Sequence, residues 1–280
     1  MNMKHMVSML AVTACLAVAM SGCGVLPSGA NGVGEEAQTP SAPSTQGGEA
    51  DPADKASGQD DQESGESSVD AHAGRPSLAD TIREVNGIPT VTNPHDVTVI
   101  VNKQRALPAD YIPADLVEPQ VTFPFEEKAE KRMMRAEAAR ALEALFLKAE
   151  MDGVKLYAVS GYRSYRTQKS LYETYVQTQG AEHAAAFSAE PGKSEHQTGL
   201  AMDVSGADSA TRLEQTFADT PEGKWLEANC AEFGFVIRYP KGKEAITGYA
   251  YEPWHLRYVG TEIAEEVMSQ GLTLEEYFTK

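Results

Sequence analysis

Hydrophobic periodicity becomes regular in this chain only after about residue 80. The strongest helical pattern covers residues 126–151, where apolar side chains recur at three- and four-residue steps: Met134, Ala138, Ala141 and Leu145. Charged residues lie between them, so a helix here would have one apolar stripe. We therefore predict an amphipathic helix over residues 126–151, with Gly153 as its C-cap.

Short apolar runs predict the strands of a small sheet. These runs are residues 97–101, 156–160, 200–204, 234–240 and 249–258. In the third run Leu200, Met202 and Val204 alternate with Ala201 and Asp203. Because side chains alternate across a strand, Asp203 should lie on the face opposite the three larger apolar residues.

Further helices are predicted over 164–179, 221–233 and 261–270, with Ser164 as the N-cap of the first. Residues 208–219 indicate an acidic loop. The order of strands and helices shows neither a regular βαβ repeat nor a glycine-rich phosphate loop. We therefore predict an α+β fold with a small antiparallel sheet flanked by helices.

Two stretches contain side chains suited to metal-assisted catalysis: residues 194–203 and 252–255. His196, Asp203 and His255 offer two imidazoles and a carboxylate, and a catalytic zinc keeps three protein ligands and one open position for water. Glu252 would be free to act as a base on that water. We predict one zinc ion for the domain. Residues three apart face opposite sides of a flat strand, so Glu252 and His255 can converge only if the chain bends or bulges between them.

Residues 102–278 resemble the VanY-type D-alanyl-D-alanine carboxypeptidases, which are zinc peptidases of bacterial peptidoglycan. The family pattern Ser-x-His-x-x-Gly-x-Ala-x-Asp is met in full within residues 194–203, and Glu-Pro-Trp-His is met at 252–255. Residues 160–164, Ser-Gly-Tyr-Arg-Ser, match the segment that contains the family's active-site arginine. The resemblance implies a zinc-peptidase domain over residues 81–280, with the same metal ligands and Glu252 as catalytic base.

The same resemblance implies a D,D-carboxypeptidase, which removes the C-terminal D-alanine from peptidoglycan stem peptides. Relatives with these motifs are L,D-carboxypeptidases that act on tetrapeptide stems, and the motifs do not separate the two. A non-catalytic lipoprotein that binds zinc and the cell wall is a further alternative, although a pure binder would have no need of Glu252. A structural surface lipoprotein with an incidental motif is another, because a lone histidine is more often a surface or core residue than a ligand.

Arg163 follows a predicted strand, where it could bind a carboxylate or stabilise the oxygen that gains charge in the transition state. Arg166 is the rival candidate, but it falls within a predicted helix and is expected to face solvent. A peptide that ends in D-alanine presents a free carboxylate. Ser194, Ser160 and Gln168 are the candidate hydrogen-bond donors for that substrate.

The first 80 residues are predicted to export and tether the domain. An apolar run over residues 6–20 has the length of a signal-peptide core, and Ser-Gly-Cys at 21–23 resembles a bacterial lipoprotein signal. We expect residues 1–22 to be removed and Cys23 to be lipidated; an ordinary secretory signal or a retained anchor is the alternative. Residues 23–80 are acidic and poor in large apolar side chains, so they should be disordered. The expected location is extracytoplasmic, on the outer face of the bacterial cytoplasmic membrane.

The composition of the chain limits the classes of partner that it can have. The chain has 280 residues and a formal net charge of −17, which argues against a nucleic-acid partner. Its three cysteines do not make a disulfide framework, since Cys15 would leave with the signal. Cys230 should then be a buried and inert thiol. We expect a monomer that meets peptidoglycan stem peptides and, through Cys23, the membrane.

Overall fold

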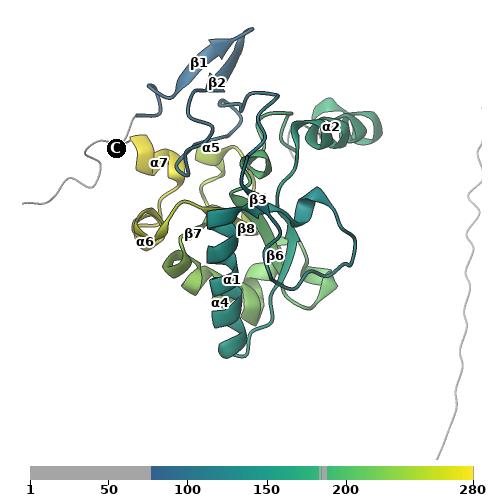
Figure 1. Ribbon diagram of the computed structural model, residues 1–280, viewed down its shortest axis with the longest axis vertical. Coiled ribbons are helices and arrows are strands. Elements are labelled where there is room, and N and C mark those ends of the chain that lie inside the picture. Colours follow the sequence, from purple (N-terminus) through teal and green to yellow (C-terminus); the bar gives the residue numbers. More distant parts are fainter. Residues whose placement is uncertain (1–76, 183, 185–187, 280) are drawn as a thin grey trace, which may run out of the picture. The chain divides into compact units, whose positions relative to one another are not determined.

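The structure is a computed structural model that describes residues 77–182, 184 and 188–279, shown as a ribbon in Figure 1. The predicted signal peptide, the Cys23 lipidation site and the predicted linker up to residue 76 lie outside the described residues. The first described residues are bound to the rest of the domain, because the Leu78 carbonyl accepts a 2.6 Å hydrogen bond from Arg105. No helix in the described part of the chain is long and apolar enough to cross a membrane.

A four-stranded antiparallel sheet forms the centre of the fold, which confirms the predicted α+β class. Its strands are β5 (Tyr157–Ser160), β6 (Ala201–Ser205), β7 (Phe235–Tyr239) and β8 (Glu252–Tyr258), in the spatial order β5-β6-β8-β7. Two short antiparallel pairs lie outside it: β1 (Ile82–Val85) with β2 (Ile88–Val91), and β3 (Leu116–Val117) with β4 (Met134–Arg135).

The helices follow the predicted order. They are α1 (Ala136–Met151), α2 (Tyr165–Gln179), α4 (Pro221–Asn229), α5 (Glu244–Thr247), α6 (Thr261–Ser269) and α7 (Leu274–Thr279). Short 3₁₀ turns occur at Glu130–Arg132, Glu195–Thr198, Ser209–Thr211, Gln215–Asp219 and Cys230–Phe233. Ser164 caps α2 as predicted, since its side chain accepts a hydrogen bond from the Thr167 amide.

The two faces of the sheet have different roles. On one face Leu142 and Leu145 of α1 pack with Met202 and Leu256 of the sheet, and all four are fully buried. Burial of a leucine side chain of this kind contributes roughly 1.5–3 kcal/mol to the free energy of unfolding. The opposite face holds Asp203 and His255, which pair directly across β6 and β8. The sheet therefore has an apolar face that stabilises the domain and a polar face that carries two of the predicted metal ligands.

The prediction of a helix from residue 126 is wrong over its first ten residues, because α1 begins at Ala136. The preceding backbone makes hydrogen bonds to other parts of the chain instead. The carbonyls of Lys131 and Met133 accept from the Gly161 and Tyr162 amides at 2.6 and 2.7 Å. The Arg135 amide donates to the Gly199 carbonyl at 2.8 Å. A helix over this segment would use these groups internally and would detach it from the site.

The predicted strand at residues 97–101 is also wrong, although Val99, Ile100 and Val101 are buried as their side chains suggest. The segment is irregular, and its carbonyl groups bind two arginines instead of a neighbouring strand. Arg257 donates to the carbonyls of residues 97 and 99, and Arg105 donates to that of Ile100. The buried guanidinium groups therefore satisfy a backbone that would otherwise need a sheet.

The structure confirms Cys230 as a free and buried thiol. It follows α4, in the 3₁₀ turn that continues the predicted helix to Phe233. Burial raises the pKa of its thiol to about 12, so the reactive thiolate is not formed near neutral pH.

Candidate metal centre and active site

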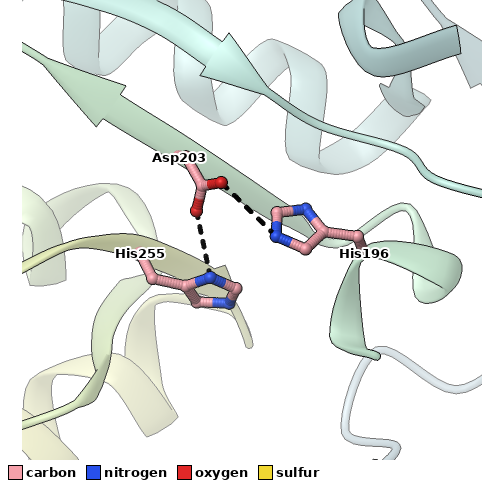
Figure 2. A group of neighbouring side chains, drawn as sticks. All are labelled: His196, Asp203 and His255. Carbon is pink, nitrogen blue, oxygen red and sulfur yellow. Dashed lines mark ion pairs between the residues drawn. The ribbon is translucent and has the colours of Figure 1, made fainter. Parts of the chain in front are cut away.

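His196, Asp203 and His255 converge on one point, as Figure 2 shows. Asp203 and His255 are cross-strand neighbours on the polar face of the sheet, and His196 reaches them from the 3₁₀ turn just before β6. The Asp203 carboxylate lies 3.5 Å from His196 Nε2 through Oδ2 and 3.1 Å from His255 Nδ1 through Oδ1. The fold thus brings together the three predicted metal ligands.

These residues fit a metal ion. One ligand atom from each of the three side chains lies within 4.8 Å of the other two. Asp203 Oδ1 is close to His255 Nδ1 but is not aligned for a hydrogen bond, so this buried oxygen has no hydrogen-bond partner among the described residues. Two nitrogen donors and one carboxylate around an open point are the ligand set that a catalytic zinc takes.

A bulge in β8 places Glu252 beside the three ligands. Tyr239 pairs with Glu252 and Ile237 with Leu256, so a step of two residues along β7 corresponds to a step of four along β8. The bulge turns Glu252 to the same side as His255, and its Oε2 lies 3.8 Å from His255 Nδ1. The bend that the sequence required is therefore present. Burial raises the pKa of Glu252 to about 7, which suits a group that must accept a proton near neutral pH.

The outer nitrogen of His196 contacts a backbone carbonyl. Its Nδ1 lies 2.8 Å from the Gly161 oxygen, so the ring carries its proton there and leaves Nε2 for a metal. A side chain at Gly161 would bring a Cβ atom within 2.5 Å of the Met133 oxygen, so only glycine fits this close approach. Burial lowers the pKa of His196 to about 3, which keeps the ring neutral.

The outer nitrogen of His255 faces a carboxylate instead. Its Nε2 lies 3.5 Å from Glu195 Oε2, and Glu195 is also paired with Arg238 and Arg257 at 2.7 and 2.8 Å. Burial alone would lower the pKa of His255, but the nearby carboxylates of Asp203 and Glu195 outweigh it and raise the pKa to about 9. For Glu195, the two arginines outweigh burial and hold the carboxyl pKa far below its usual range.

Glu195 was not predicted as a site residue, although the sequence contains a signal for it. Arg238 and Arg257 interrupt otherwise apolar strands, and a buried cation requires a buried carboxylate partner. Glu195, in the midst of the first motif, was the acidic residue to consider.

Arg163 lines a cavity over the three candidate ligands and lies three residues after the end of β5. Its guanidinium donates to Gln168 Oε1 at 2.9 Å and to Ser160 Oγ at 3.1 Å. The amide nitrogen of Gln168 in turn donates to Ser188 and Ala189, so this buried side chain is fully engaged. The substrate contacts expected of Gln168 and Ser160 stay predictions, and in this structure the two residues fix Arg163. Arg166 is exposed on α2, as expected.

A cavity of about 310 Å³ opens over the metal ligands. Ser194, Arg163 and Glu252 lie on its wall, together with aromatic and aliphatic side chains: Tyr175, Leu213, Tyr239, Tyr249 and Trp254. A larger cavity of about 640 Å³ lies between α1 and residues 118–122 and contains none of the candidate catalytic groups. The positions of the candidate catalytic groups therefore identify the smaller cavity as the candidate active site.

Three ligand side chains, an adjacent carboxylate with a raised pKa and a cavity with one arginine define a candidate site of the metal-hydrolase class. Residues 131–261 match the family model of the VanY D-alanyl-D-alanine carboxypeptidases. The Bacillus subtilis protein "Putative carboxypeptidase YodJ" is 51% identical over 199 residues that cover 71% of this chain and 73% of YodJ. This chain belongs to the VanY carboxypeptidase family.

Two solved structures extend the comparison. The LdcB LD-carboxypeptidase is 51% identical, with a TM-score of 0.69 over 71% of this chain and 93% of that one. The vancomycin-resistance D,D-pentapeptidase VanY, solved as a mutant in complex with Zn(II), is 34% identical. Its TM-score is 0.51 over 65% of this chain and 98% of that one.

Proposed function

We propose that this protein is a zinc-dependent L,D-carboxypeptidase that removes the C-terminal D-alanine from tetrapeptide stems of peptidoglycan. One observation outweighs the others. The LdcB LD-carboxypeptidase is similar over nearly its whole length, at 51% identity, whereas the D,D-pentapeptidase VanY is 34% identical. The similarity to LdcB extends through the domain that builds the cavity, so it bears on the substrate as well as on the metal ligands.

The side chains of the cavity fit a peptide that ends in a carboxylate. Arg163 is held by Ser160 and Gln168, so its position is fixed before a substrate arrives. Its guanidinium can bind the terminal carboxylate or the oxygen that gains charge as the scissile carbonyl is attacked. Ser194 lies on the cavity wall as a further donor.

Glu252 is the proposed base. With a pKa raised to about 7, its carboxylate can take a proton from the attacking water and then give it to the leaving amine of D-alanine. A zinc ion held by His196, Asp203 and His255 would polarise the scissile carbonyl and acidify the water. The open cavity beside Glu252 leaves room for both water and peptide.

Digestion of defined stem peptides tests the proposal. The zinc-loaded protein is incubated with matched tetrapeptide and pentapeptide stems, and the products are followed by mass spectrometry. We expect the tetrapeptide to lose one alanine, and the Glu252→Gln variant to leave it intact. A protein that cleaves neither peptide contradicts the proposal.

A D,D-carboxypeptidase is the second candidate. The matched family model is described as D-alanyl-D-alanine carboxypeptidase, and the D,D-pentapeptidase VanY is covered over 98% of its length. Loss of alanine from the pentapeptide but not from the tetrapeptide would establish this alternative.

We further propose that lipid on Cys23 anchors the domain to the outer face of the membrane. The lipoprotein-like sequence Ser-Gly-Cys at residues 21–23 supports it. Cys23→Ala should move the protein from the membrane fraction to the soluble fraction, while a fragment that begins at Ser77 should cleave soluble peptides as the parent does.

A further inference from the structure

Glu195 is the most deeply enclosed carboxylate at the site. It is 1% exposed and stands in the 3₁₀ turn next to the candidate ligand His196. Burial of an ionised carboxylate is costly unless opposite charges and hydrogen bonds compensate it. Here the compensation comes from Arg238 on β7 and Arg257 on β8, both fully buried.

The two oxygens of Glu195 have separate partners. Oε1 accepts from Arg238 Nε at 2.7 Å and from Arg257 Nη1 at 2.8 Å. Oε2 receives no hydrogen bond from either arginine and points to His255 Nε2 across 3.5 Å. Arginine–carboxylate pairs are frequently bidentate, but here both guanidinium groups bind Oε1, which leaves Oε2 for a third partner.

His255 Nε2 has the complementary need. It is buried and, within the described chain, has no closer polar neighbour that satisfies it as a hydrogen bond. The same ring turns Nδ1 toward Asp203 and the candidate metal position. An imidazole that binds a metal through one nitrogen carries its proton on the other, and that proton requires an acceptor.

We propose that Glu195 is a positioning residue for the metal site: it accepts the Nε2 proton of His255 and thereby directs Nδ1 to the metal. Arg238 and Arg257 hold the carboxylate ionised and fixed in place. The inference rests on the proposed function for the presence of zinc and adds the residue that sets which nitrogen of His255 binds it. Removal of such an outer partner weakens metal binding by roughly 10–100-fold.

The first test uses the parent protein. In the zinc-loaded protein, nitrogen-15 NMR of the histidine rings should show His255 bound through Nδ1, with a slowly exchanging proton on Nε2. His255 bound through Nε2 would overturn the proposal, and this measurement needs no variant to fold. A parent protein that takes up no zinc would overturn the proposed function as well, so the two failures are distinguishable.

The second test compares two variants that each remove one carboxylate paired with Arg238. Glu195→Gln should lower zinc affinity roughly 10–100-fold in a competition assay with a chromophoric chelator. It should also shift the His255 Nε2 proton while the His196 Nδ1 proton, bound to Gly161, stays in place. Glu275→Gln is the matched control, because Glu275 accepts from Arg238 and Asn102 and contacts no candidate ligand. It should keep the parental zinc affinity.

Equal losses of zinc affinity in the two variants would show that Glu195 acts only through general stability, and would overturn the proposal. Parental zinc affinity and an unshifted His255 signal in Glu195→Gln would overturn it too. If Glu195→Gln does not fold, Glu195→Asp replaces it. The shortened carboxylate keeps the charge and withdraws from His255, so it should still lower zinc affinity.

Discussion

His196 and His255 present nitrogens to the same point but are supported in opposite ways. The His196 ring is held by the uncharged backbone oxygen of Gly161, at a point where the backbones of Gly161 and Met133 approach each other closely. His255 rests on Glu195, whose position depends on two arginines from two strands. Burial lowers the pKa of His196 to about 3, whereas the carboxylates of Asp203 and Glu195 outweigh burial and raise the pKa of His255 to about 9.

Because of this difference, the His196 half of the site is sensitive to changes in the backbone, and the His255 half is sensitive to side-chain substitutions. The His196 support can be disturbed only by moving the backbone, because no side chain provides it. The His255 support can be removed by one substitution that leaves the backbone intact. The following variants test whether the two halves fail in these different ways, from the largest expected effect to the smallest.

Loss of either ring should abolish the site altogether. His196→Ala and His255→Ala should each lose bound zinc and all hydrolysis, because two protein ligands do not retain a catalytic zinc at its working concentration. Metal analysis of the purified proteins, with peptide digestion alongside, measures both. Full zinc occupancy in His196→Ala would show that the three-ligand assignment is wrong.

The next largest effect should come from variants that distinguish the catalytic base from the carboxylate ligand. Glu252→Gln should bind zinc as the parent does and lose turnover by ~10²–10⁴-fold, since the amide cannot accept a proton. Asp203→Asn should weaken zinc binding itself, because a neutral amide is a poorer ligand than a carboxylate. Zinc titration and peptide hydrolysis on the two variants together decide the roles. The opposite pattern would show that the roles assigned to the two carboxylates are reversed.

A methyl group at Gly161 tests the backbone support of His196. Gly161→Ala should destabilise the domain by about 1–3 kcal/mol and lower zinc affinity, because the new Cβ meets the unyielding Met133 oxygen. Gly206→Ala is the control, since the atoms nearest to its Cβ would belong to the flexible side chain of Glu222. Urea unfolding and zinc titration compare them. Equal behaviour of the two variants would remove the special role of Gly161.

The smallest effect concerns the charges behind His255. Arg238 outweighs burial and holds the pKa of Glu275 below its ordinary value of 4.5. A lowered folded-state pKa contributes stability above about pH 4.5 that is lost as pH falls further, at no more than about 1.4 kcal/mol per pH unit. Urea unfolding of the metal-free protein between pH 7 and pH 3, in parent and Glu275→Gln, measures it. The variant should show the shallower dependence; identical slopes would exclude Glu275 as a contributor.

Local patterns predicted most of the elements and the three candidate ligands. The alternation around Asp203 defined β6, and the two motifs supplied His196, His255 and Glu252. The bulge in β8 was inferred from chemical need rather than from propensity. The failures share a cause, which is contact between distant parts of the chain. Arg238 and Arg257 lie 43 and 62 residues from Glu195, so no local pattern joins them.

The two misassigned segments follow the same rule. Residues 97–101 have the composition of a strand, yet the long-range hydrogen bonds of Arg257 and Arg105 hold them in an irregular conformation. Residues 126–135 have the composition of a helix, yet their backbone binds the turn that presents Arg163. Tertiary hydrogen bonds overrode local propensity in both segments.

The bulge in β8 also determines how the site tolerates motion. Glu252 and His255 belong to one short stretch of a single strand, whereas Asp203 and His196 belong to its neighbour and the turn before it. Sliding of β8 against β6 would therefore change the distances among the metal ligands while the spacing of Glu252 and His255 stayed almost constant. An insertion between residues 252 and 255 would have the reverse effect, since it would turn one of the two side chains away. Natural variation in length should accordingly be confined to the loops around the cavity.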